Sequence, residues 1–409
     1  MAISAKMKNF VANGSMIRRM FEEGARLKAL YGADKVFDFS LGNPNLPPPD
    51  IFKSTLKAVV EADEPDLHSY MPNAGLPAAR AAIAARLRSE QKVNVQAENV
   101  VVTCGAAGAL NIVFKALLEP GDEVLVSAPY FVEYGSIADN HGGILKVAPS
   151  KPDFSLDLEA LESAMGSKTK IVLVNTPNNP TGKIYPEADL LGLAAVMRRK
   201  GALYGRTLYL VSDEPYRKLA YDGAIVASPL ASCPDSIVVT SYSKELSLPG
   251  ERIGFAAVNP MAEDADDIVA ALSLANRILG FVNAPSLMQK VIALLIDQEG
   301  RDKGLPACVD VSVYQRKRDL LAEGLKAAGY DFILPEGAFY LFPRIPISDD
   351  AAFIALLKEE KILVVPGSGF GAPGYFRIAY CVDDGTIMGA LPGFKRAMEK
   401  AAGSAPARG

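Results

Sequence analysis

Six short apolar segments lie between residues 98 and 260 and are separated by stretches of helical pattern. They span residues 100–103, 124–127, 171–174, 208–211, 237–240 and 254–258. Each is almost entirely apolar instead of alternating with polar residues, which is typical of strands buried on both faces of a sheet. Because helical patterns separate them, the sequence predicts βαβ units and a mainly parallel sheet. In such a sheet, ligands bind beyond the carboxyl ends of the strands.

The pattern changes in the last quarter of the chain. A long amphipathic helix is predicted over residues 310–328. Further strands are predicted over residues 339–342, 362–365 and 376–380. This part is predicted to form a smaller α+β domain, so that the chain as a whole belongs to the α/β class with a second domain.

Composition limits the classes of partner. The chain has 409 residues, 49% of them apolar, which is enough for two domains or for one large domain with a lobe. The net charge is −4 and no basic stripe occurs, which argues against nucleic acid and anionic membranes as partners. No stretch of 18 uncharged apolar residues occurs, so no membrane-spanning helix is expected.

The cysteines and the N-terminus indicate a compartment. Cys104, Cys233, Cys308 and Cys381 are widely spaced, and the chain has only two histidines. We therefore expect free thiols in a reducing compartment, with no metal site and no disulfide framework. The N-terminal residues lack the apolar core of a signal peptide, so a cytoplasmic protein is expected.

The most informative polar segment is 241–254, which directly follows the predicted strand 237–240. A lysine at a strand end, here Lys244, can be partly desolvated, which lowers its pKa and frees the amine for Schiff-base chemistry. The hydroxyls of Ser241 and Ser243, together with Arg252, suit a phosphate. A lone Ser-x-Ser-Lys is more often a surface loop. An amine beside a phosphate site is, however, what pyridoxal phosphate requires of a protein.

Four other segments, 103–108, 128–134, 175–182 and 212–216, also follow predicted strands. The first opens a helix with small residues that let backbone N–H groups approach a phosphate. The second carries an aromatic ring suited to stacking, and the third holds an amide side chain in a proline-rich turn. The fourth offers a carboxylate for a protonated pyridine nitrogen. Taken singly, each also fits a tight turn, a core aromatic, a plain loop or a helix cap.

Arg377 lies in a predicted late strand. An unpaired arginine buried there would be costly. Two explanations are open: a structural ion pair, or a bidentate clamp on the α-carboxylate of a substrate.

Together these segments match the class I/II aminotransferases from about residue 40 to residue 380. The fourteen residues 241–254 match the family's lysine-attachment signature position by position. The chain therefore resembles a fold type I pyridoxal phosphate enzyme of the aspartate/alanine aminotransferase group. The resemblance implies a large cofactor-binding domain over residues 46–300. It also implies that residues 1–45 join residues 301–409 in the small domain.

The resemblance also implies a function. The protein would be an aminotransferase that moves an amino group from an L-amino acid to a 2-oxo acid by a ping-pong mechanism, through an aldimine on Lys244. The freed Lys244 amine would be the catalytic base. In the family, a tyrosine at the place of Tyr70 reaches the phosphate in the neighbouring subunit, which implies a homodimer with shared active sites.

The implied cofactor-binding residues are Tyr70, Gly105, Ala106, Ala107, Phe131, Asn179, Asp213, Tyr216, Ser241, Ser243, Lys244 and Arg252. Phe131 would stack on the ring, Asn179 and Tyr216 would bond its phenolic oxygen, and Asp213 would hold its nitrogen protonated. The implied substrate-binding residues are Gly42, Asn179 and Arg377. Gly42 would offer its backbone N–H to the α-carboxylate.

The donor amino acid stays open between neutral and acidic. Dicarboxylate-specific members carry a second arginine shortly before a segment that resembles residues 281–285. Ile278 stands at that position here and Arg277 is adjacent. An apolar residue there makes a neutral donor such as alanine plausible, whereas Arg277 would allow aspartate.

Two other functions are alternatives to an aminotransferase. A carbon–sulfur β-lyase on the same scaffold would keep every cofactor residue, and it would release ammonia and pyruvate without an added oxo acid. A cofactor-binding regulator without turnover usually carries a DNA-binding module, for which this chain has neither spare length nor a basic patch.

Overall fold

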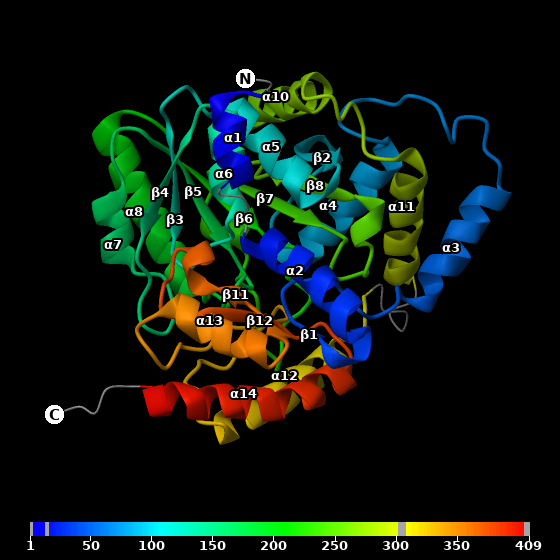
Figure 1. The fold of residues 1–409 in the computed structure, drawn as a ribbon. Helices are drawn as coiled ribbons and strands as arrows, with labels where there is room; N and C mark the ends of the chain where they lie inside the picture. The colour runs from blue at the N-terminus through cyan, green and yellow to red at the C-terminus, as the bar shows by residue number, and fades with distance from the viewer. Residues whose placement is uncertain (1–2, 13–15, 302–307, 405–409) are drawn as a thin grey trace.

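The computed structural model describes residues 3–12, 16–301 and 308–404. Its largest element is a seven-stranded sheet (Figure 1). In spatial order the strands are β2 (Val100–Thr103), β8 (Gly254–Val258), β7 (Ser236–Ser241), β6 (Tyr209–Asp213), β5 (Thr169–Asn175), β3 (Glu123–Ser127) and β4 (Ile144–Ala148). Only β8 runs antiparallel to its neighbours, β2 and β7. The other pairs are parallel, which confirms the predicted mainly parallel sheet.

The six predicted strands match β2, β3, β5, β6, β7 and β8 to within two residues at either end. The prediction missed β4, the strand at the edge of the sheet. Ile144 and Val147 of this strand are exposed, and Lys146 interrupts its apolar residues. A strand at the edge of a sheet can leave positions open to solvent and then has no continuous apolar run, which is why the pattern overlooked it.

Helices cover both faces of the sheet, because successive strand residues point to opposite sides. Val101 packs on one side, and its neighbours Val100 and Val102 pack on the other. The face of Val101 is covered by α5 (Gly105–Leu117), α6 (Glu133–Asn140) and α10 (Ala265–Ile278). The opposite face is covered by α3 (Asp50–Glu61), α4 (Pro77–Gln91), α7 (Leu158–Ala164), α8 (Glu187–Tyr204) and α11 (Ser286–Arg301).

The C-terminal part forms a second layer, drawn in orange and red in Figure 1. It has an antiparallel sheet of β11 (Val365–Pro366), β12 (Phe376–Ala379) and β9 (Tyr340–Leu341). Against this sheet pack α12 (Val311–Ala327), α13 (Asp350–Glu359) and α14 (Asp384–Ser404). The predicted helix over 310–328 is confirmed as α12, whose cap is Asp310 accepting the N–H of Ser312.

Two helices, α1 (Ala5–Ala12) and α2 (Met16–Tyr31), precede β1 (Phe37–Asp38). α2 contacts β11 of this second layer, whereas α1 lies beside the helices of the large sheet, where Lys6 pairs with Asp139 of α6 (Figure 1). β1 pairs in parallel with β10 (Ile362–Leu363). The predicted strand 362–365 is therefore two short strands, because β10 pairs with β1 and β11 pairs with β12. The short helices are α9 (Pro229–Ser232) and the 3-10 turns Ala33–Lys35, Ala97–Asn99, Pro249–Glu251 and Gly367–Phe370.

Gly254 begins β8 where this strand passes very close to the start of α5. A Cβ at position 254 would lie 2.9 Å from the Cα of Gly105 and would also collide with the carbonyl oxygen of Thr240. We expect Gly254→Ala to destabilise the protein by about 1–3 kcal/mol, because backbone on both sides cannot move away from the added methyl group.

Thermal unfolding midpoints of wild type and variant measure this effect. Gly250→Ala is the matched control, since a Cβ there meets no atom within 4 Å. Equal midpoints for Gly254→Ala and Gly250→Ala would show that the contact is not a constraint.

Candidate active site

The parallel strands end at one edge of the large sheet, and a cavity of about 280 Å³ lies beyond this edge. The carboxyl ends of β2, β3, β5, β6 and β7 all point there. Because β8 is antiparallel, it starts at the same edge and brings Arg252, two residues before the strand, to the cavity. Of the predicted residues, the cavity is lined by Gly42, Ala106, Ala107, Phe131, Asn179, Asp213, Tyr216, Ser241, Ser243, Lys244, Arg252 and Arg377.

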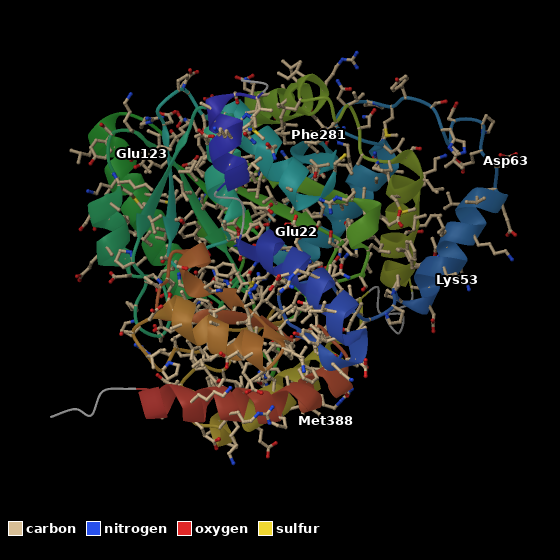
Figure 2. All side chains as sticks on the ribbon, viewed as in Figure 1. Glu22, Lys53, Asp63, Glu123, Phe281 and Met388 are labelled. Atoms are coloured by element: carbon tan, nitrogen blue, oxygen red, sulfur yellow. The ribbon has the colours of Figure 1, made fainter. Side chains whose placement is uncertain are left out.

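Gly105 and Tyr70 do not line the cavity. Gly105 begins α5 just behind it, with a positive φ of 73°. A Cβ on this residue would come within 3.0 Å of a guanidinium nitrogen of Arg252. Tyr70 is 93% exposed and borders a separate surface hollow together with Phe281, which is labelled in Figure 2. Its predicted contact with a partner subunit stays a prediction.

The Lys244 amine is held inside the cavity. Its Nζ donates a hydrogen bond to the carbonyl oxygen of Gly42 at 2.7 Å. It also lies 5.5 Å from the ring centroid of Phe339 and 5.9 Å from that of Tyr216. Burial lowers the pKa of Lys244 to about 8, and the nearby guanidinium of Arg377 adds to this lowering. About a tenth of the amine is therefore neutral and nucleophilic at pH 7, far more than for an ordinary lysine.

Asp213 is buried at the end of β6 with one oxygen unsatisfied. Its Oδ2 accepts a hydrogen bond from the Tyr134 hydroxyl at 2.7 Å, whereas its Oδ1 has no partner. Burial raises the pKa of Asp213 to about 7, and the bond from Tyr134 opposes this rise. A buried acceptor without a donor is costly, so this oxygen is suited to a cationic N–H of a ligand.

Arg377 is a buried guanidinium on β12. Its Nη1 donates to Oδ1 of Asn179 at 3.0 Å and its Nη2 to the carbonyl oxygen of Ser40 at 2.6 Å, while its Nε has no partner. Within the described residues no carboxylate pairs with it, so a structural ion pair does not explain it there. Rings of Tyr340 and Phe370 flank the guanidinium, with centroids at 4.6 and 4.9 Å. This arrangement is suited to an anionic ligand.

The end of the cavity near α5 is suited to a phosphate. The first turn of α5 brings Ala106 and Ala107, and β7 and the loop after it bring the hydroxyls of Ser241 and Ser243. Arg252 completes this end of the cavity. A helix N-terminus offers free N–H groups and a favourable dipole, and a guanidinium adds a full charge.

Sequence reasoning missed four residues that shape this site. Tyr134 bonds Asp213, and Asn175 accepts the backbone N–H of Asn179 at 2.7 Å and so fixes the turn. The hydroxyl oxygen of Tyr340 lies 2.7 Å from that of Tyr216, and Glu133 brings a carboxylate to the cavity lining. Tyr134, Glu133 and Asn175 lie inside motif segments and could have been found there. Tyr340 carries no local signal, because only the packing of the two sheets brings it to the cavity.

In residues 3–12, 16–301 and 308–404, no group of three or more His, Cys, Asp or Glu side chains is arranged to hold a metal ion. No helix there is both long enough and apolar enough to pass through a lipid bilayer.

An amine, an anion-binding end and an unsatisfied carboxylate at the edge of a mainly parallel sheet are features of a fold type I pyridoxal phosphate enzyme. The family model described as "Aminotransferase class I and II" matches residues 34–391, so the chain belongs to this family. It is a pyridoxal phosphate-dependent aminotransferase, which acts on amino acids and 2-oxo acids.

Similar proteins cover nearly the whole chain. A probable aspartate/prephenate aminotransferase of Aquifex aeolicus is 32% identical over 379 residues, which cover 89% of this chain and 91% of the relative. An amino transferase of Eubacterium rectale matches in structure with a TM-score of 0.92 at 38% identity, covering 98% of this chain and 99% of that one. The aspartate aminotransferase of Thermus thermophilus, solved with maleate, matches with a TM-score of 0.85 at 28% identity, covering 97% and 100%.

The burial of Lys244 predicts how its amine reacts with pH. In the cofactor-free protein, the rate of Lys244 modification by an arylating reagent should rise with pH and level off above about pH 8, because its pKa is lowered to about 8. Model-peptide lysines have a pKa of about 10.4. Peptide mapping by mass spectrometry separates Lys244 from the surface lysines. A Lys244 rate that still rises tenfold per pH unit beyond pH 9 would contradict the lowered pKa.

Proposed function

We propose that Lys244 is the catalytic lysine of this aminotransferase and that the cavity around it binds pyridoxal phosphate and the amino acid. The single observation that carries the proposal is that a buried amine with a lowered pKa and a buried carboxylate with a free oxygen line the same cavity. When bound, the cofactor supplies an electron sink for the electrons released at the substrate Cα. The side chains bind, orient and move protons around it.

The cofactor would be held at four places in this cavity. The unpartnered Oδ1 of Asp213 would accept the N–H of a protonated pyridine ring. The phosphate would lie at the start of α5, which is flanked by Ser241, Ser243 and Arg252. Phe131 would cover one face of the ring, with an aromatic contact to Tyr134 fixing it at 5.5 Å between centroids. Asn179 and Tyr216 would bond the phenolic oxygen.

Lys244 would move the proton. Its amine, once freed, would take a proton from the substrate Cα and transfer this proton to the cofactor. Its hydrogen bond to the Gly42 carbonyl holds the Nζ on that side of the cavity. A pKa near 8 suits a group that must both accept and donate a proton near neutral pH.

Arg377 would bind the α-carboxylate that all donors share. Its Nε is unsatisfied, and its other nitrogens are positioned by Asn179 and Ser40. The backbone N–H of Gly42 would add a further donor. A bidentate guanidinium binds a planar carboxylate with fixed orientation, which directs the Cα towards Lys244.

We also propose a homodimer with shared sites, and the position of Tyr70 supports this proposal. This side chain lies outside the cavity of its own chain and is almost fully exposed. In a symmetric dimer it would reach the phosphate end of the partner's cavity. We further propose that residues 46–300 form the cofactor domain, that residues 1–45 and 301–409 form the small domain, and that the protein works in the cytoplasm.

Neutral donors are the proposed substrates. The cations in the cavity lining are Lys244, Arg252 and Arg377, and each has a role in the scheme above. A second substrate carboxylate would find no free cation among the described residues of this chain, and Glu133 would repel it. Aspartate, which the names of the Aquifex and Thermus relatives include, would need a cation from the partner. Arg277, exposed near the end of α10, is the candidate.

Complementation between two inactive variants tests the shared site. Lys244→Ala should bind the cofactor through its phosphate but lose essentially all turnover. Tyr70→Ala should bind the cofactor about 10–100-fold more weakly, because a hydrogen bond to a charged group is lost. After subunit exchange at limiting cofactor, the mixture should recover about a quarter of wild-type activity, because a heterodimer keeps one intact site. Activity equal to the mean of the two variants would contradict a shared site.

A donor screen tests the substrate class. Wild type is mixed with alanine, aspartate or glutamate, and the change in cofactor absorbance gives kcat/KM for each half-reaction. We expect alanine to match or exceed aspartate. Arg377→Lys should lower kcat/KM for all three donors together by at least about tenfold, because the bidentate fork is lost.

Arg277→Ala is the deciding control for the acidic donors. It should leave alanine unchanged. A strong aspartate preference in wild type that disappears in Arg277→Ala would show that Arg277 supplies the second cation, and that the neutral-donor proposal is wrong.

A further inference from the structure

Two buried tyrosine hydroxyls meet at the wall of the cavity. Tyr216 follows β6 of the large sheet and Tyr340 starts β9 of the small sheet, and their hydroxyl oxygens are 2.7 Å apart. The two side chains are 4% and 2% exposed, and both line the cavity. Their rings pack edge to face with centroids 5.6 Å apart. This hydrogen bond therefore joins the two layers of the molecule at the reacting end of the site.

The number of hydroxyl protons limits how many hydrogen bonds this pair can donate to a ligand. Each hydroxyl has one proton, so a hydrogen bond between the two uses the proton of one of them. If Tyr216 donates, it has no proton left for a ligand and only Tyr340 can donate onward. If Tyr340 donates, the proton of Tyr216 stays available to an oxygen in the cavity. The proposed bond from Tyr216 to the phenolic oxygen therefore requires the second arrangement.

The surroundings favour Tyr340 as the donor. The guanidinium of Arg377 lies 4.6 Å from the ring centroid of Tyr340 and stabilises negative charge on its oxygen. Burial raises the pKa of Tyr340 to about 12, and Arg377 limits this rise. Burial also raises the pKa of Tyr216, and Asp213 adds to this rise but does not act on Tyr340. A guanidinium against the ring favours a hydroxyl as the donor, whereas a nearby carboxylate disfavours it, so the proton of Tyr340 belongs in the bond.

We propose that Tyr340 is a positioning residue that donates its proton to Tyr216 and thereby directs the Tyr216 proton at the phenolic oxygen of the bound cofactor. This inference rests on the proposed function of the cavity. In a chain of hydrogen bonds each bond polarises the next, so the bond to the phenolic oxygen is stronger than Tyr216 alone would make it. A stronger bond stabilises the anionic oxygen and lowers the pH at which the holoenzyme chromophore loses its proton.

Among the described residues, the other charged and titratable groups that face the pair are Arg377, Cys381, Asp213, Lys244 and Tyr134. None of them changes in the variants below. The Tyr340→Phe variant keeps the ring that stacks on Arg377, so the α-carboxylate clamp is retained.

The test is a spectroscopic pH titration of the holoenzyme, which does not depend on turnover. Tyr340→Phe should raise the absorbance midpoint by about 0.3–1 pH unit, and Tyr216→Phe should raise it by more. The double variant should match Tyr216→Phe alone, because Tyr340 acts only through Tyr216. The KM for the donor should stay within about twofold in Tyr340→Phe, because its ring still stacks on Arg377.

Tyr380→Phe is the matched control. The Tyr380 hydroxyl belongs to a second buried pair with Tyr221, at 3.4 Å, away from the cavity lining. Its loss should leave the midpoint unchanged. Cofactor content and thermal midpoint confirm that each variant is folded.

The outcomes distinguish a failure of the proposed role of Tyr340 from a failure of the proposed role of Tyr216. If Tyr216→Phe shifts the midpoint and Tyr340→Phe does not, the proposed relay from Tyr340 through Tyr216 to the phenolic oxygen is wrong, while the role of Tyr216 stands. A downward shift in Tyr340→Phe would show that Tyr216 donates to Tyr340, which also overturns the relay. If Tyr216→Phe has no effect, the role of Tyr216 in the proposed function fails together with the relay.

Discussion

The direction of the strands in the large sheet is the constraint on which the site depends. Parallel strands end at one edge, so the residues after β5, β6 and β7 must converge although they are distant in sequence. The reversal of β8 brings Arg252 to this edge from the strand's start instead of its end. Gly254 allows β8 to pass against the start of α5, which puts the guanidinium beside the helix N-terminus. One backbone arrangement therefore builds the amine, the carboxylate and the anion-binding end together.

The cavity concentrates ionisable groups that the protein itself does not satisfy. Asp213 has a buried oxygen without a donor, Arg377 a buried nitrogen without an acceptor, and Lys244 an amine whose charged form is disfavoured. Each of these groups costs the protein stability, because no partner within the protein compensates its desolvation. A ligand with a protonated ring nitrogen and a carboxylate would satisfy these groups. The same features that reduce stability are therefore the features that select the ligand.

The second layer contributes residues to the site as well as enclosing it. β12 carries Arg377, and β9 carries Tyr340. Hydrogen bonds from Arg377 to Asn179 and between Tyr340 and Tyr216 cross from the small sheet to the loops of the large one. These hydrogen bonds connect Arg377, the proposed binder of the substrate carboxylate, to the residues proposed to bind the cofactor. A displacement of one layer relative to the other would alter both at once.

The sequence by itself determined the parts of this protein that depend on local pattern. Apolar runs predicted six of the seven strands of the large sheet, and motif segments identified twelve of the residues that line the cavity. The antiparallel direction of β8, the edge strand β4 and the contact of Tyr340 with Tyr216 were decided by the tertiary structure. A strand buried on both faces has the same composition in either direction, and an edge strand with exposed positions has no continuous apolar run. Tyr340 reaches the cavity only because two sheets pack together, and no local sequence pattern encodes a contact across 124 residues.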